Sequence, residues 1–197
     1  AAGSHTAALA ANDLVVDGLF HQSGVIRAST LNEMFDIAAC LAMQPLPAGR
    51  RLGVVTNAGG PGILAVDACE ALGLLVPEFS GDTRARLAAF LPAAAALANP
   101  VDMVASADGA AYAAAVQAVL EADDVDGVLM LYTPVDPSRQ PEILDGMARG
   151  VQAARAAGVR EKPVVACVMA ETGAGHLAAG DERIPVYTFP EIGRAHV

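Results

Sequence analysis

The glycine-rich turn Thr-Asn-Ala-Gly-Gly-Pro-Gly, residues 56–62, has the residue types and spacing to bind an anion. It follows a β-branched apolar run and precedes a segment with helical spacing, so we expect a helix to begin inside it. Glycine allows close approach of a ligand to the backbone, and Pro61 suits the first helical turn. The N–H groups of that turn, with about half a positive charge from the helix dipole, predict a phosphate site. Its candidate residues are Asn57, Gly59, Gly60 and Gly62.

Two other interpretations of this turn stay open. It is also what a tight strand-to-helix connection with no ligand looks like. Alternatively, Gly60-x-Gly62-x-x-Ala65 fits the dinucleotide-binding pattern, with Glu78 further along the chain to bond a ribose. That alternative predicts a dinucleotide-binding oxidoreductase domain.

Two more turns carry polar residues at the ends of expected strands. Asp102 closes Asn-Pro-Val-Asp, and Thr133 follows a buried apolar run. Because the carboxyl ends of parallel strands share one edge of a sheet, Asp102 and Thr133 are candidates to line a crevice beside the glycine-rich turn. Asp102 is equally suited to cap a turn through its side chain.

The remaining residues with chemical potential have simpler interpretations. His21 on an expected helix and His176 in a glycine-rich loop are expected to be solvated or packed. The acidic run at 121–126 is typical of a solvated turn. We expect no metal site, because no set of side chains has ligand spacing. The cysteines are expected to be buried inert thiols, and they are Cys40, Cys69 and Cys167.

The elements that would position these residues alternate between strand and helix. Strands are expected at 52–57, 74–76, 101–103, 127–132, 163–169 and 185–189, and helices at 61–72, 82–91, 110–121 and 141–157. Continuous apolar strands are typical of a sheet buried on both faces. The pattern predicts an α/β fold with a doubly wound parallel sheet in three layers.

Residues 1–50 are too short to bury a core of their own. They contain an expected helix at 12–22, a short strand at 25–27 and a capping box, Thr30 to Glu33, that opens a helix ending at Met43. We expect residues 1–44 to be the end of a preceding domain and 45–49 to be a linker. The six residues 192–197 match the translation of a common sequencing adapter, so we expect them to be an artefact.

Composition excludes several classes of protein. Of 197 residues, 54% are hydrophobic and 17% are charged, which argues against disorder. The net charge of −10 argues against a nucleic-acid partner. No run of about eighteen apolar residues predicts a membrane span, and no signal peptide is recognisable, so we expect a cytoplasmic protein.

Taken in order, the motifs resemble those of the NDP-forming acyl-CoA synthetases, the superfamily of succinyl-CoA synthetase and ADP-forming acetyl-CoA synthetase. The resemblance extends to about Glu191. It is carried by residues 4–9, 24–27, 45–47, 57–62, 99–102 and 125–134.

The resemblance implies a flavodoxin-like CoA-ligase domain at 50–191, preceded by the C-terminal remnant of a histidine-bearing domain at 1–44. It implies that the parent enzyme converts acetyl-CoA, ADP and phosphate into acetate, ATP and CoA through a phosphohistidine. His5 matches the histidine of the Ser-His-Thr motif and would be phosphorylated, while the glycine-rich turn would hold the phosphoryl group. The parent would also need an ATP-grasp domain or subunit, a CoA-binding Rossmann domain and Mg²⁺, so we expect this chain alone to be inactive.

One residue departs from the family pattern. Ala7 stands where the family usually has glycine after Ser-His-Thr, which restricts the backbone of the loop that carries His5. Some members of the superfamily are fused to a lysine acetyltransferase domain. An acyl-CoA-sensing regulatory module of a protein lysine acetyltransferase is therefore the alternative to an enzyme.

Overall fold

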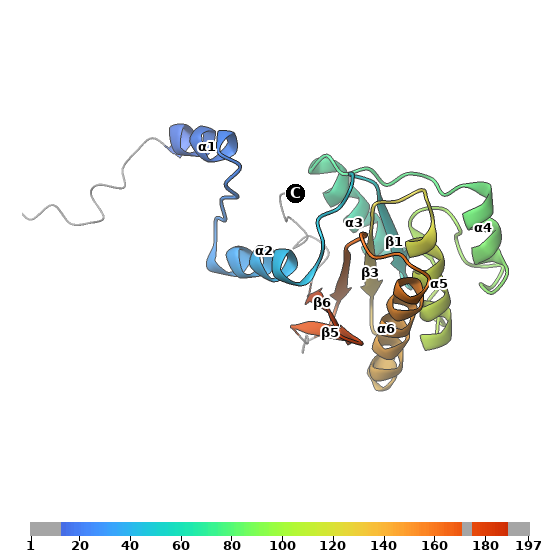
Figure 1. Cartoon of the computed structure of the whole chain (residues 1–197). Helices are drawn as coiled ribbons and strands as arrows, with labels where there is room; N and C mark the ends of the chain where they lie inside the picture. The colour runs from blue at the N-terminus through green and yellow to red at the C-terminus, as the bar shows by residue number, and fades with distance from the viewer. Residues whose placement is uncertain (1–12, 171–174, 189–197) are drawn as a thin grey trace, which may run out of the picture.

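The computed structural model describes residues 13–170 and 175–188. Two helices, α1 (Asp13–Gln22) and α2 (Leu31–Met43), precede the sheet. Thr30 caps α2, because its side chain accepts a hydrogen bond from the N–H of Glu33, as the predicted capping box requires. Figure 1 shows α1 away from the sheet and α2 beside β6 (Glu182–Tyr187).

The sheet has six strands in the order β2-β1-β3-β4-β6-β5. The other strands are β1 (Leu52–Thr56), β2 (Val101–Asp102), β3 (Gly127–Tyr132), β4 (Val164–Val168) and β5 (His176–Ala179). Every pair is parallel except β5 with β6. The parallel strands therefore follow the flavodoxin-like order, which confirms the predicted fold class.

Helices cover both faces of this sheet. They are α3 (Gly59–Ala71), α4 (Gly81–Ala88), α5 (Gly109–Glu121) and α6 (Gln140–Ala156), with a short 3₁₀ turn at Pro137–Arg139. Alternate strand residues point to opposite faces. Val55 and Met130 belong to the larger core with α5 and α6, whereas Val54 and Leu131 pack with Ala65 of α3. Figure 1 shows α5 and α6 side by side.

Two expected strands are absent from the described structure. Residues 25–27 are extended without a sheet partner. Residues 74–76 form no strand. Of these three residues only Leu75 pairs with a neighbouring segment, in an isolated parallel bridge to Arg51. Beyond that bridge the side chain of Asn99 accepts from the N–H of Val54 and donates to the carbonyl of Leu52, so it takes the place of a neighbouring strand.

One strand was not expected. His176, predicted to lie in a glycine-rich loop, is instead the first residue of β5. This strand pairs with β6 through a tight hairpin in which Gly180 has a φ of +66°. Its residues lack the β-branched side chains that signal a strand, so the pairing depends on the hairpin turn.

None of the helices in the described part of the chain combines the length and the apolar character that crossing a membrane requires.

Candidate functional site

The glycine-rich turn lies between β1 and α3, at the carboxyl edge of the sheet. Helix α3 begins at Gly59, and its N-cap residue, Ala58, offers no side-chain cap. By contrast, the N-termini of α2, α4 and α5 are capped by the side chains of Thr30, Ser80 and Asp108. Within the described residues, the backbone N–H groups of Gly59 and Gly60 donate to no acceptor. Two amides at a positive helix end are thus available to an anion.

The glycines of this turn serve different purposes. A Cβ at Gly62 would lie 3.2 Å from the Thr56 methyl carbon, and one at Gly59 would lie 3.0 Å from Asp102 Oδ2, so both permit close packing. A Cβ at Gly60 would meet nothing within 4 Å. Packing inside the described chain therefore does not require a glycine at this exposed position.

The side chain of Asn57 is committed to the fold. Asn57 is 2% exposed, and its amide bonds both backbone groups of Thr133. The hydroxyl of Tyr112 donates to the carbonyl of Leu131, in the strand that leads to Thr133, at 2.7 Å. Burial raises the pKa of Tyr112 well above its ordinary value, so its hydroxyl stays protonated as a donor. The side chain of Asn57 therefore positions the turn.

Asp102 lies next to the start of α3. Its Oδ1 accepts the N–H of Val104 at 3.0 Å. Its Oδ2 would lie 3.0 Å from a Cβ at Gly59. Val104 has a φ of +63°, a rare conformation for a β-branched residue. Asp102 therefore closes a turn through its side chain and lies next to the start of α3.

The side chain of Thr133 also has a partner, since its hydroxyl donates to Met169 Sδ at 3.6 Å. The structure thus brings the ends of β1, β2 and β3, with Asn57, Asp102 and Thr133, to one edge. The crevice expected between Asp102 and Thr133 stays a prediction.

A hollow of about 180 Å³ beside this edge is lined by Asn57, Tyr132 and Arg139, among others. Sequence reasoning missed Tyr132 and Arg139 as candidates, although Tyr132 ends a wholly buried strand, which is a position that signals such an edge. Neither of the two hollows described in the chain is lined by Gly60 or Glu78, which the dinucleotide alternative would need.

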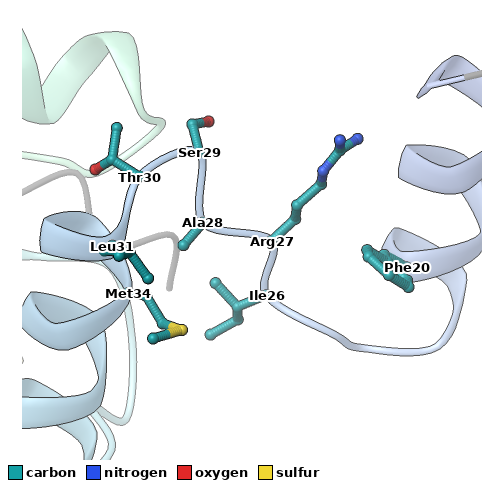
Figure 2. Close-up of a pocket in the computed structure, with 8 residues that line it drawn as sticks. All are labelled: Phe20, Ile26, Arg27, Ala28, Ser29, Thr30, Leu31 and Met34. Carbon is teal, nitrogen blue, oxygen red and sulfur yellow. The ribbon is translucent and has the colours of Figure 1, made fainter. Parts of the chain in front are cut away.

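A larger hollow of about 510 Å³ lies between α1 and α2. Figure 2 shows the apolar side chains of Phe20, Ile26, Leu31 and Met34 around it. Ile26, Leu31 and Met34 are 41%, 71% and 44% exposed. These side chains have the character of a core that is open on one side.

The other candidates are placed as follows. His5 lies outside the described residues. His21 lies near the end of α1. Cys69 and Cys167 are buried as expected, whereas Cys40 is only half-buried. Across residues 13–170 and 175–188, no three His, Cys, Asp or Glu side chains come together as metal ligands would.

Two family models match the chain. The model of the ligase-CoA domain matches residues 52–191, and that of the succinyl-CoA ligase-like flavodoxin domain matches residues 1–41.

The chain is 38% identical to the alpha subunit of acetate–CoA ligase [ADP-forming] II from Pyrococcus furiosus, over 97% of the chain and 42% of that subunit. It is 31% identical to 4-hydroxybutyrate–CoA ligase [ADP-forming] from Nitrosopumilus maritimus, over 97% of the chain and 27% of that protein. The chain therefore spans less than half the length of these relatives.

Solved structures are also similar to this chain over most of its length. A Pyrococcus horikoshii protein superimposes with a TM-score of 0.81 at 34% identity, over 95% of this chain and 43% of its own. Acetyl-coenzyme A synthetase 1 from Ca. Korarchaeum cryptofilum, in complex with phosphate and ADP, superimposes with a TM-score of 0.79 at 28% identity, over 98% of this chain and 41% of its own.

Proposed function

The chain belongs to the ligase-CoA domain family, and from this premise we propose that it is part of an ADP-forming acyl-CoA synthetase. The observation that carries the proposal is the uncapped N-terminus of α3, where the amides of Gly59 and Gly60 have no acceptor within the described residues. A helix end of this kind stabilises a phosphoryl group without any basic side chain. An acidic chain can therefore take part in phosphoryl transfer.

In the proposed reaction, acetyl-CoA, ADP and phosphate give acetate, ATP and CoA. A phosphate oxygen first bonds to the acetyl carbonyl carbon of acetyl-CoA, and the bond from that carbon to sulfur breaks, which gives an acyl phosphate and releases CoA. A ring nitrogen of His5 then forms a bond to the phosphorus of the acyl phosphate, and the bond from phosphorus to the carboxylate oxygen breaks, which releases acetate. The phosphoryl group then passes to ADP, which restores the imidazole. Gly59 and Gly60 donate their N–H groups to the phosphoryl oxygens, while Asn57 and Gly62 keep the turn in place.

The parent enzyme supplies the remaining sites. We propose that an ATP-grasp domain or subunit binds ADP and ATP with Mg²⁺, and that a Rossmann domain binds CoA. Relatives named as alpha subunits of ADP-forming ligases support a multi-part assembly. This chain on its own should neither form ATP nor become phosphorylated.

The domain boundaries are part of the proposal. Residues 50–191 form the ligase-CoA domain, and residues 1–44 end a preceding flavodoxin-like domain, joined by 45–49. The exposed apolar side chains around the hollow in Figure 2 support this assignment, because a βα unit with an unpaired extended segment needs a sheet to cover it.

The test is to incubate the complete parent protein with acetyl-CoA and ³²P-labelled phosphate and to measure acid-labile label on the protein. We expect label in the wild type, its transfer to ATP when ADP is added, and its loss in His5→Ala. His21→Ala, which alters a histidine on α1, is the matched control and should keep the label. Persistence of the label in His5→Ala would overturn the role of His5.

The same experiment separates the alternatives. An acyl-CoA-sensing regulatory module would bind acetyl-CoA without becoming labelled, and a lysine acetyltransferase domain encoded in the parent gene would favour it. A dinucleotide-binding oxidoreductase domain would bind NAD(H) instead of acetyl-CoA.

A further inference from the structure

Gln44, directly after α2, is buried among backbone groups of the sheet. It is 8% exposed, and its Oε1 accepts the N–H of Val164 at 2.7 Å. Its Nε2 donates to the carbonyl of Arg183 at 2.8 Å and to Glu182 Oε1 at 3.2 Å. The first pair of β4 with β6 is Ala166 with Val186, so Gln44 takes the place of a strand partner for Val164.

Further contacts join the same region to the sheet. Arg155 of α6 binds the carboxylate of Glu182 with two N–H groups, at 2.8 and 2.9 Å, and also donates to the carbonyl of Lys162. The Tyr187 hydroxyl donates to the carbonyl of Asp36 in α2 at 2.9 Å. The end of α2 is thus bonded to β4 and to β6, which is itself held by α6.

The other end of the segment is held by Asp126. The N–H of Arg51 donates to Asp126 Oδ2 at 2.9 Å, and the Arg51 guanidinium pairs with Oδ1 at 2.6 Å. A Cβ at Gly49 would lie 2.4 Å from Asp126 Oδ2, so the backbone rests directly against this carboxylate. Pro45 and Pro47 restrict the chain between the two ends.

We infer that residues 44–51 are a fixed strap that holds α2 in one orientation on the sheet of the ligase-CoA domain, with Gln44 as its principal anchor. The strap prevents α2 from rotating relative to the sheet at the expected junction of the two domains. The segment before α2 can then approach the start of α3 in only one orientation. The inference concerns the fold and stands whether or not His5 is phosphorylated.

Hydrogen exchange in the complete protein tests the strap, because the amides of Val164 and Arg51 bond directly to its anchors. We expect both amides in the wild type to exchange as slowly as those of β3. Gln44→Met keeps the side-chain volume but removes the anchor, and should accelerate exchange at Val164 by roughly tenfold or more. Gln117→Met is the matched control, since Gln117 bonds only Glu121 within α5.

Two results would overturn the strap. One is exchange at Val164 in the wild type as fast as at a freely exposed amide, and the other is unchanged exchange there in folded Gln44→Met. If Gln44→Met does not fold, Gln44→Glu keeps the acceptor for Val164, loses the two donations and places a second carboxylate beside that of Glu182. It should accelerate exchange in residues 44–51 with β3 unaffected, and unchanged exchange would also reject the inference.

Discussion

The side-chain amide of Asn57 bonds both backbone groups of Thr133. Its Nδ2 donates to the Thr133 carbonyl at 2.9 Å, and its Oδ1 accepts the Thr133 N–H at 2.9 Å. These two bonds join the loops that follow β1 and β3. The position of the glycine-rich turn is therefore tied to the central strands of the sheet.

Asn57→Ala should destabilise the fold, because it leaves two half-buried backbone groups of Thr133 without partners. We expect the free energy of unfolding to fall by about 1–3 kcal/mol, measured by urea denaturation. Thr133→Ala keeps both backbone groups and loses only the weak contact with Met169, so it is the control and should cost less. Equal losses in the two variants would contradict this account.

Gly60→Ala separates the anion site from the fold. Nothing lies within 4 Å of the added Cβ, so stability should be unchanged or rise by up to about 1 kcal/mol, as for glycine-to-alanine changes in helices. In the parent enzyme the methyl group would crowd the phosphoryl group, and labelling of the protein by phosphate should fall roughly tenfold or more. Full labelling with an unchanged melting temperature would argue against contact at this amide.

Asp126 should make stability depend on pH in the acidic range. Its hydrogen bond from Arg51, opposed by burial, holds the pKa of Asp126 below its ordinary value of 3.8. The carboxylate therefore stabilises the fold above that value, and this contribution is lost as the pH falls through the lower pKa of the folded state.

We accordingly expect the free energy of unfolding of Asp126→Asn to be lower than that of the wild type at neutral pH by about 1–3 kcal/mol, with a smaller gap at about pH 3. Asp145→Asn removes one exposed carboxylate on α6 and controls for net charge. A gap that is constant from neutral to acidic pH would rule out this linkage.

Cys69 should resist thiol reagents in the folded protein. Burial, assisted by the charge of Glu70, raises the pKa of Cys69 to about 11. The reactive thiolate is then a fraction of roughly 1 in 1,000 at pH 8. Mass spectrometry after a short exposure to iodoacetamide should find Cys69 unmodified in the native chain and modified in urea, whereas rapid native modification would contradict the burial.

Much of the fold was predictable from local signals. The capping box at Thr30, the apolar run of β3 and the glycine-rich start of α3 each specify an element through nearby residues. The strand at 74–76 was wrongly predicted, since the side chain of Asn99, distant in sequence, occupies the edge of β1. β5 was missed because its pairing depends on a hairpin turn and not on β-branched residues.

The sequence by itself determined the alternation of strands and helices and the types of residue at the candidate site, because propensity and hydrophobic periodicity act over a few residues. Only the tertiary structure decided which of those side chains turn into the fold and which lie beside the start of α3. Asn57 is turned inward to Thr133, and Asp102 is turned toward Gly59. The tertiary structure also decided that Gln44 bonds Val164 of β4 and so anchors α2. This hydrogen bond joins residues far apart in the sequence, which only the packed sheet brings together.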